Sequence, residues 1–354
     1  MQNRYFAASN SSRGFTNYFK EVFCRADMVY VVKGGPGTGK SSFMKRCSRR
    51  AEEKGCMVEN YCCSSDADSL DGVFIVDGKR SIGVLDGTAP HVWEPEFPGV
   101  CEQMVDLGQF WDEKLLLAQK NEIMALNRKK SAAYNKVYTY LRSCGNLRTV
   151  TDMLLRDVLY KEKLMRAIRR IVESLTLSDG AATVIPTPLD AVTMKGCVRF
   201  DTFREMGENL YSVSFAQGIG QIVLCELEEQ LKGKNITMRV AYDAICPWLV
   251  NGIFIEEMKT AFLISDGDKE SNRPDEKNTK YINSNRFVDI DELRSARSEI
   301  RYTSKLSSSS LEGALHALSE VNVYHFLLED IYKNAMDFKA LTEFSNGFLN
   351  TFLE

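Results

Sequence analysis

The sequence lacks the features that mark secreted, membrane-spanning and zinc-binding proteins. Its ten cysteines include no C-x-x-C pair and no Cys/His spacing of a zinc site. There is no sign of a signal peptide, and no apolar run is long enough to cross a bilayer. We therefore expect a reduced, cytoplasmic protein with no membrane partner.

A strong net charge is also missing. The 45 Lys and Arg residues and the 48 Asp and Glu residues leave a net charge of −3, so no global field draws the chain to nucleic acid or to an anionic membrane. Two basic spots, at 128–130 and 166–170, are interpreted as solvated helix faces, with contact to nucleic acid or an acidic partner as the alternative. Nucleic acid is therefore not expected as a partner.

The sequence does contain a glycine-rich segment in a characteristic setting. Residues 34–41 read GGPGTGKS and fit G-x-x-x-x-G-K-[ST], the phosphate-binding loop. The apolar run 28–32 before it predicts a buried parallel strand, and 41–53 after it predicts a helix. Glycine lets successive amides point inward and form an anion nest at the helix N-terminus. The predicted nucleotide-binding residues are Gly35, Pro36, Gly37, Thr38, Gly39, Lys40, Ser41 and Ser42.

Three side chains have predicted roles toward the nucleotide and its metal. Lys40 would reach the β- and γ-phosphates, and Ser41 would ligate Mg²⁺ through its hydroxyl. Asp86 ends the apolar strand predicted at 81–85 and would bind the same ion as the Walker B carboxylate. ATP and Mg²⁺ are therefore the predicted cofactors. The N-K-x-D motif that reads guanine in GTPases is absent, which favours ATP over GTP.

The residue that would orient the attacking water is not the usual one. Asp86 is followed by Gly87, where many ATPases carry glutamate. Either His91 or one of the aspartates in SSDADSLD at 64–71 orients the attacking water, or the protein does not hydrolyse ATP quickly. The alternative for His91 is a structural role in its loop, and the alternative for the aspartates is an Asp/Ser turn. The candidate catalytic residues are Lys40, Asp86, His91 and Asp66.

The second half of the chain repeats the first. At an offset of 181 positions, 30–32 matches 211–213 and the loop glycines 37 and 39 match 218 and 220. At an offset of 180, Asp86 matches Asp266. Two halves of one ancestral unit is the simplest account. Lys40 aligns with Gln221 and Ser41 with Ile222, so the second loop lacks both the ammonium and the Mg²⁺ hydroxyl and is predicted to be a pseudo-site.

The repeat divides the chain into four predicted segments. Residues 1–106 and 178–288 are predicted α/β units, and 107–177 and 289–354 are predicted helical hairpins. The hairpins are expected to break at 143–146 and 307–310. A polar link is expected at 178–195 and a mobile, charged surface loop at 266–286. The predicted fold is therefore α/β: a duplicated P-loop NTPase with mostly parallel sheets, each half followed by a helical hairpin.

The chain resembles a family of poorly characterised P-loop ATPases from Gram-positive bacteria, built from tandem units of this kind. The resemblance rests on KGGPGTGKS at 33–41, on CSSD at 63–66 with DSLDG at 68–72, and on DGTAPH at 86–91. It covers most of the chain and implies nucleotide binding. Such proteins look like ATPases or are labelled nucleotide kinases by analogy. Both halves often carry a phosphate loop, and here the second has lost it.

We expect an Mg²⁺-dependent ATPase whose second half is a catalytically silent partner in an intramolecular pseudo-two-fold dimer. The bound nucleotide would move the helical hairpins, which would reach an unknown protein partner. Arg204 or Arg239 of the second half is a candidate to enter the ATP site. Two alternatives stay open: a nucleotide or small-molecule kinase with Asp66 or Asp68 as base, and a non-hydrolysing ATP-sensing scaffold.

Overall fold

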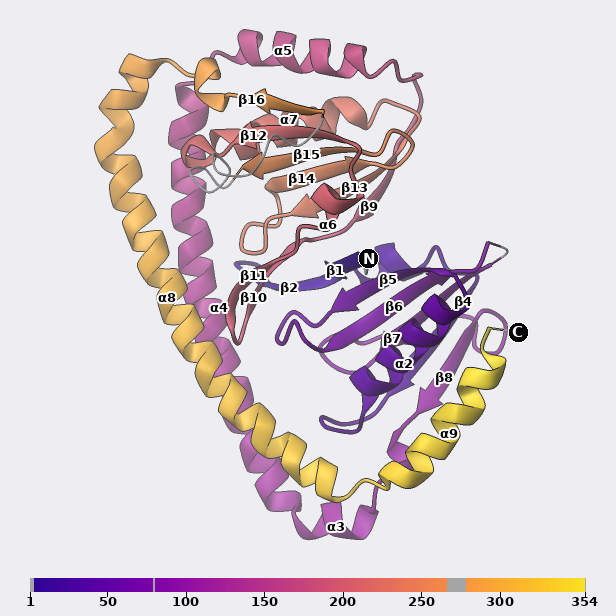
Figure 1. The fold of residues 1–354 in the computed structure, drawn as a ribbon. Coiled ribbons are helices and arrows are strands. Elements are labelled where there is room, and N and C mark those ends of the chain that lie inside the picture. Colours follow the sequence, from indigo (N-terminus) through magenta and orange to yellow (C-terminus); the bar gives the residue numbers. More distant parts are fainter. Residues whose placement is uncertain (1–2, 79, 266–277, 354) are drawn as a thin grey trace.

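The first half of the chain folds around a six-stranded sheet. The computed structural model describes residues 3–78, 80–265 and 278–353 and shows an α/β protein (Figure 1). Three strand pairs of this sheet are parallel and two are antiparallel. In spatial order the strands are β1 (Asn3–Phe6), β5 (Met57–Cys62), β6 (Leu70–Val76), β7 (Ser81–Asp86), β4 (Met28–Lys33) and β8 (Glu102–Asp106).

The second half builds a sheet with the same connectivity, which confirms the predicted duplication. Its strands follow the order of the first sheet one for one, with the same parallel and antiparallel pairs. Part of the loop expected at 266–286 is ordered structure, because 279–287 forms a strand and a 3-10 turn; 266–277 lies outside the described residues. The strands are β9 (Thr183–Pro186), β13 (Thr237–Tyr242), β14 (Val250–Ile255), β15 (Thr260–Ser265), β12 (Asn209–Ser214) and β16 (Thr279–Ile282).

Each unit also carries a two-stranded hairpin of partly polar sequence. The link expected at 178–195 is wrong, because two strands of the second unit, at 183–186 and 190–193, lie within it. Polar residues can form these strands because the opposite half accepts their hydrogen bonds: the Ser9 hydroxyl donates to the Ala244 carbonyl at 2.8 Å. The elements are β2 (Ala8–Ser11), β3 (Gly14–Asn17) and α1 (Phe19–Phe23), then β10 (Asp190–Thr193), β11 (Gly196–Arg199) and α6 (Thr202–Met206).

Helices cover the sheets and connect the halves. Helices α2 and α7 follow the two glycine loops, and α4 and α8 are 38 and 45 residues long. None of the described helices is both long enough and apolar enough to cross a bilayer. The bounds are α2 (Lys40–Glu53), η1 (Gly108–Phe110), α3 (Glu113–Ala118), α4 (Lys120–Asp157), α5 (Lys161–Ser174), η2 (Ala216–Gly218), α7 (Ile219–Leu231), η4 (Ser284–Phe287), α8 (Ile290–Asn334) and α9 (Phe338–Thr351).

The two helix breaks predicted at 143–146 and 307–310 are wrong, since α4 and α8 run through them. Gly145 does not end the helix. It allows a close contact with Ser12, because a Cβ at position 145 would lie 2.3 Å from the Ser12 Cβ. In α8 the serines are accommodated by local and interhelical bonds. The Ser310 hydroxyl donates to the Leu306 carbonyl at 2.9 Å, and the Ser307 hydroxyl lies 3.2 Å from the Cys144 sulfur.

Helices pair between the halves, so the hairpin predicted within each half is also wrong. Helix α4 lies antiparallel to α8 along its length, and each then delivers a short helix to the other unit (Figure 1). Helix α5 packs on α7, and α9 packs on α2. The cause is the apolar face of each short helix: Ile168 lies in the core of the second unit and Leu341 in the core of the first.

A buried ion pair joins the two sheets. Glu59 of β5 lies 2.6 Å from Arg239 of β13 and also pairs with Arg25, and both Glu59 and Arg239 are almost fully buried. Burial alone would raise the pKa of Glu59, but the two guanidinium groups lower it below its usual value. Arg239 also pairs with Glu256. Its guanidinium is therefore held at the interface between the sheets, and the expectation that it enters the ATP site is wrong.

Candidate active site

The glycine loop lies between β4 and the N-terminus of α2, as the motif predicts. Gly37 and Gly39 have φ of 71° and 87°, a region that side chains with a Cβ rarely adopt, and Gly39 caps the helix. The Thr38 hydroxyl donates to the Gly35 carbonyl at 2.9 Å and fixes the turn. No side chain caps the first turn of α2. Its amides, together with the helix dipole, are therefore oriented for an anion.

Lys40 folds back over this loop. Its ammonium donates to the carbonyls of Gly34 and Gly35 at 3.0 and 2.8 Å. The same nitrogen lies 3.7 Å from an Asp86 carboxylate oxygen, and both side chains are largely buried. The cation predicted to reach the phosphates is thus at the loop and faces the predicted Walker B carboxylate.

Asp86 ends β7 beside β4, where Val32 is its neighbour across the sheet. One of its oxygens accepts hydrogen bonds from the amide and hydroxyl of Thr88, at 2.8 and 2.6 Å. Burial raises the pKa of the Asp86 carboxyl, and the charge of Asp71 adds to the rise, while Lys40 opposes it. An added cation near Asp86 would therefore favour its ionised form.

Ser41 and Asp86 are the residues that would hold Mg²⁺. The Ser41 hydroxyl accepts a hydrogen bond from the Leu70 amide at 2.9 Å, which ties α2 to β6, and Ser42 is exposed. Within the described residues there is no group of three His, Cys, Asp or Glu side chains that could hold a metal alone. Mg²⁺ at nucleotide sites needs only one or two protein oxygens beside phosphates and water. A hydroxyl and a carboxylate therefore fit the ion.

His91 and Asp71 form a buried pair next to these residues. Asp71 is the extra residue of a β-bulge in β6, and its carboxylate lies 3.0 Å from the His91 Nε2. The imidazole packs against the rings of Phe15 and Phe19. Burial alone would lower the pKa of His91, but Asp71 raises it above its usual value. The predicted site residue His91 is thus fixed beside Asp71, within electrostatic reach of Asp86 and Lys40.

Asp66 and Asp68 are engaged elsewhere. The Lys195 ammonium, in the turn between β10 and β11, lies 2.9 Å from an Asp66 oxygen and 2.5 Å from an Asp68 oxygen. Asp66 also accepts a hydrogen bond from the Ser69 hydroxyl at 2.9 Å. In the described part of the chain, no hydrogen bond or ion pair joins either aspartate to Lys40. This arrangement matches the alternative of an Asp/Ser turn, fixed here by the second half.

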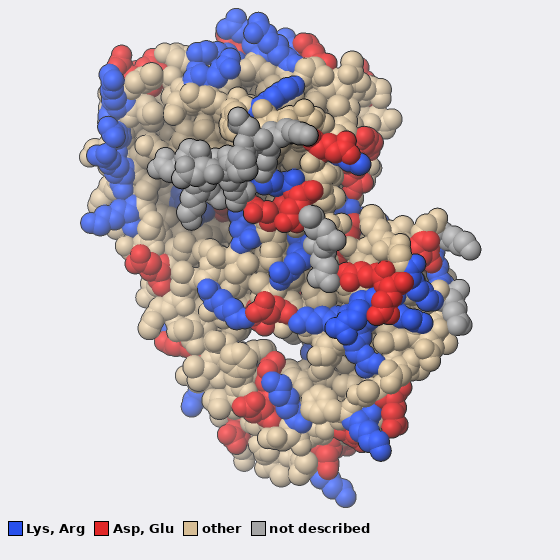
Figure 2. Space-filling model, viewed as in Figure 1, with Lys and Arg blue, Asp and Glu red and all other residues tan. Residues whose placement is uncertain are grey.

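The end of α8 lies directly on the glycine loop, which sequence reasoning missed. A Cβ at Gly35 would come within 2.7 Å of the Tyr332 ring, and one at Gly37 within 2.7 Å of the Glu329 carbonyl oxygen. Glu329 also bonds Lys333 at 2.8 Å. The space-filling view is hollowed between the first unit and the long helices, on the side that the N-terminal end of α2 faces (Figures 1 and 2). The loop is thus shared between halves.

A signal for this contact exists in the sequence. Aspartates cap α3 and α8 at positions 112 and 289, which are 177 positions apart. The same offset relates Leu155 to Tyr332, and a Cβ at Gly218 of the degenerate loop would lie 3.3 Å from Leu155. Extending the repeat into the helices would therefore have shown that Leu155 and Tyr332 are equivalent; that each lies on a glycine loop of the other half is seen only in the structure.

In the degenerate site of the second half, polar side chains bond one another and Arg148 of the first half. Gln221 stands in the place of Lys40, and its side-chain amide donates to the side-chain oxygen Oδ1 of Asn251 at 2.7 Å. Asp243 accepts from Arg148 of α4 at 3.2 Å. Strand register also corrects the match of Asp86 with Asp266: Val213, the equivalent of Val32, lies opposite Ile264. An apolar residue therefore stands where the carboxylate would be, and Asp266 is outside the described residues.

Comparisons of the chain with protein-family models, with curated proteins and with solved structures found no match. The resemblance to tandem P-loop ATPases is therefore a hypothesis that rests on the motifs at 33–41, 63–72 and 86–91.

Proposed function

We propose that the first half binds ATP with Mg²⁺ and hydrolyses it. The observation that carries this proposal is the placement of Lys40 within a glycine loop at the start of a 14-residue helix, 3.7 Å from Asp86 at the tip of the adjacent parallel strand. A cation, open helix amides and a carboxylate at one sheet edge are the parts that phosphoryl transfer requires.

Each residue has a definite task in this proposal. Phosphate oxygens would replace the Gly34 and Gly35 carbonyls as partners of the Lys40 ammonium, because an anion is a stronger acceptor. Ser41 and Asp86 would hold Mg²⁺, which neutralises phosphate charge. The His91 imidazolium, paired with Asp71, would add positive charge beside the terminal phosphate.

ATP turnover and ATP binding test the proposal together. Lys40→Ala should weaken ATP binding and lower turnover at least tenfold, because it removes the only loop side chain that bears positive charge. Asp86→Asn should lower Mg²⁺-dependent turnover by a similar factor and change metal-free ATP binding little. Turnover is measured by phosphate release and binding by calorimetry.

A matched control lies in the second half. Gln221 occupies the position of Lys40 in the degenerate site, so Gln221→Ala should leave ATP binding and turnover within about twofold of the unmodified protein. Unchanged turnover in both the Lys40 and Asp86 variants would refute the proposal. ATP binding that depends on Lys40 without any turnover would refute hydrolysis alone.

ATP binding without turnover would point to the second candidate function, a non-hydrolysing ATP sensor. Two observations favour it: Gly87 follows Asp86, and the end of α8 packs against the loop, where it would report the bound state. The kinase alternative gains no support, because its candidate bases Asp66 and Asp68 are paired with Lys195. Nor does Arg204 gain support as a residue of the ATP site, since α6 packs against β1, β14 and β15.

A further inference from the structure

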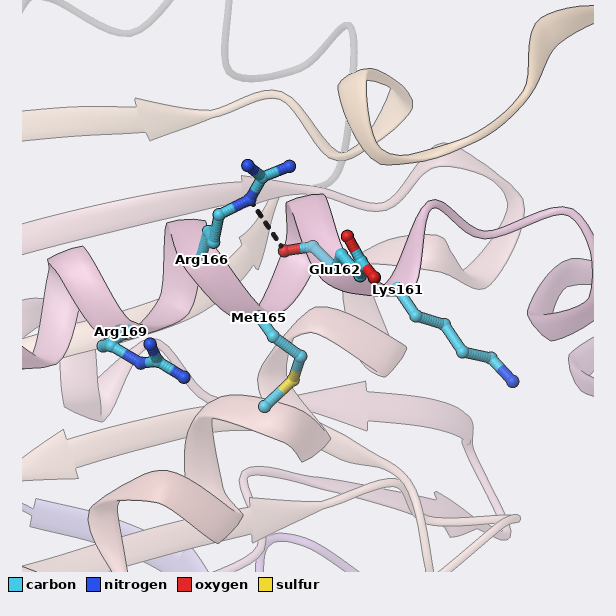
Figure 3. Close-up of a pocket in the computed structure, with 5 residues that line it drawn as sticks. All are labelled: Lys161, Glu162, Met165, Arg166 and Arg169. Carbon is cyan, nitrogen blue, oxygen red and sulfur yellow. Dashed lines mark hydrogen bonds between the residues drawn. The ribbon is translucent and has the colours of Figure 1, made fainter.

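Helix α5 presents a basic face to solvent. It lies across the far end of the second unit, with Leu164, Ile168 and Val172 buried against that unit (Figure 1). On the opposite side of the helix, four cations at 163, 166, 169 and 170 are exposed, and Lys161 is exposed at its start. Figure 3 shows a shallow pocket along this helix, lined by Lys161, Glu162, Met165, Arg166 and Arg169.

The second half supplies an internal comparison for this charge. Helix α9 is the counterpart of α5, 177 positions later, and packs on the first unit in the same way. At the positions that correspond to Lys163, Arg166, Arg169 and Arg170, it carries Ala340, Glu343, Asn346 and Gly347. Packing on an α/β unit therefore does not require cations at these positions. The basic face is particular to α5.

The start of α8 extends the basic face. Tyr160, just before α5, bonds the N-cap Asp289 of α8 at 2.8 Å, so the two helices begin side by side. From this corner a stripe of exposed cations follows α8 for 11 residues, about 16 Å at helical rise. In Figure 2, blue Lys and Arg side chains lie at the top and along the upper left of the molecule, where Figure 1 places α5 and the start of α8. The stripe consists of Arg294, Arg297, Arg301 and Lys305.

Within the described part of the chain, most of these cations have no acidic partner. Arg294 pairs with Asp291 at 3.0 Å, and the Arg166 guanidinium donates to the Glu162 backbone carbonyl at 3.3 Å. Among the described residues, no ion pair engages Arg169, Arg170 or Arg301. Their guanidinium groups are therefore available to a ligand.

We propose that this basic surface, formed by α5 and the start of α8, binds nucleic acid through its backbone phosphates. Arginine predominates, and its planar guanidinium matches phosphate in two-point hydrogen bonds. Exposed tyrosines flank the cations at 160 and 302 and could stack on bases. The net charge of −3 argues against nucleic acid as a partner. It is a sum over the whole chain, however, in which acidic residues elsewhere offset this basic surface. A local basic face is what phosphate contacts require.

An anionic membrane is the weaker match. Helices that lie on membranes insert an apolar face, and the apolar face of α5 is buried in the second core. Its exposed side carries charged side chains and no exposed large apolar one. Electrostatic contact with phosphates in solution needs no such insertion.

The test is a binding titration with the full chain. A fluorescently labelled 20-base-pair DNA duplex of mixed sequence is titrated with protein at 50 and 200 mM salt, and anisotropy is recorded. We expect affinity to fall as salt rises, with a log–log slope that loses about 0.9 for each phosphate contact removed. The triple variant Arg166→Glu, Arg169→Glu and Arg170→Glu should bind at least 30-fold more weakly, with a slope smaller by about 3.

Two further proteins make the result decisive. Replacing the same three arginines by lysine keeps the charge and should retain binding within about fivefold. A control with equal charge change on the first unit, Arg49→Glu, Lys54→Glu and Lys339→Glu, should bind within threefold of the unmodified protein. Circular dichroism and an unchanged melting temperature verify the fold of each. Equal loss in the control, absence of duplex binding at 50 mM salt, or binding only to vesicles of anionic lipid would each overturn the proposal.

Discussion

Asp190 is a carboxyl group with a strongly raised pKa outside the glycine-loop site. The residue is partly buried beside the degenerate loop, where one oxygen accepts a hydrogen bond from the Asn251 side-chain amide at 2.9 Å and the other, itself buried, has no hydrogen-bond partner among the described residues. Burial raises its pKa to about 7, the neighbouring Asp243 adds to the rise, and Arg199 and Arg148 oppose it. A proton on the unpartnered oxygen is therefore retained to near neutral pH.

This pKa predicts a pH dependence of stability. The folded pKa lies above the unfolded value, so the native state holds the extra proton between about pH 4 and pH 7, and stability falls as pH rises through that range. Asp190→Asn, which mimics the protonated acid, should flatten this fall. The difference between the two proteins should grow to a few kcal/mol by pH 8, on the order of 1.4 kcal/mol for each unit of pKa.

Urea unfolding at pH 5, 6, 7 and 8 measures this difference. His91, whose pKa is also raised, contributes a loss of stability in the same direction as its imidazole deprotonates. It does so equally in both proteins, so the comparison isolates Asp190. Parallel curves for the two proteins over this range would contradict the prediction.

At the scale of elements, the contact between α8 and the glycine loop has the sharpest structural requirement. Gly37 combines a φ of 71° with the Glu329 carbonyl 2.7 Å from where a Cβ would lie. Alanine there would strain the backbone and push the helix away. Glu329 is itself held by His325 at 3.4 Å and Lys333 at 2.8 Å, which lower its pKa to about 2. The carbonyl that alanine would meet therefore belongs to a helical turn held by its own ion pairs.

Gly37→Ala is predicted to lower the free energy of unfolding by about 2 to 4 kcal/mol, the sum of backbone strain and overpacking. Gly55→Ala is the matched control, because Gly55 has a φ of 77° and nothing lies within 4 Å of its would-be Cβ. It should cost only the strain, about 1 to 2 kcal/mol. Both values come from denaturant unfolding. Equal losses would show that α8 does not press on the loop.

Local patterns predicted the elements that depend on neighbouring residues. The strand at 28–32, the glycine loop and the helix after it follow from apolar runs and glycine spacing. The Asp71–His91 pair could not be predicted, because it depends on a bulge in β6 that moves Asp71 out of the regular ladder. The breaks expected at Gly145 and Ser307 failed because Gly145 meets Ser12, far away in the sequence, and Ser307 meets Cys144 of the opposite half; no local pattern contains either contact.

At the scale of the whole molecule, the exchange of helices makes each core a joint product of both halves. Ile168 belongs to the first half and is 1% exposed within the second core, among residues of α7. Leu341 and Phe352 belong to the second half and lie in the first core. Neither unit can therefore unfold without exposing apolar surface of the other, and the chain should unfold in a single transition.

Ile168→Ala tests this coupling because it removes apolar contacts only in the second core. The substitution should cost about 2 to 5 kcal/mol. In a Trp248→Phe background, the remaining Trp93 and Trp111 report on the first unit by fluorescence. Their transition should move to lower denaturant by the same amount as the circular dichroism of the whole chain, relative to Trp248→Phe alone. If the midpoint of tryptophan fluorescence stayed the same while that of circular dichroism shifted, the two units would unfold independently. A nucleotide bound to the first half could then not affect the second half through the cores.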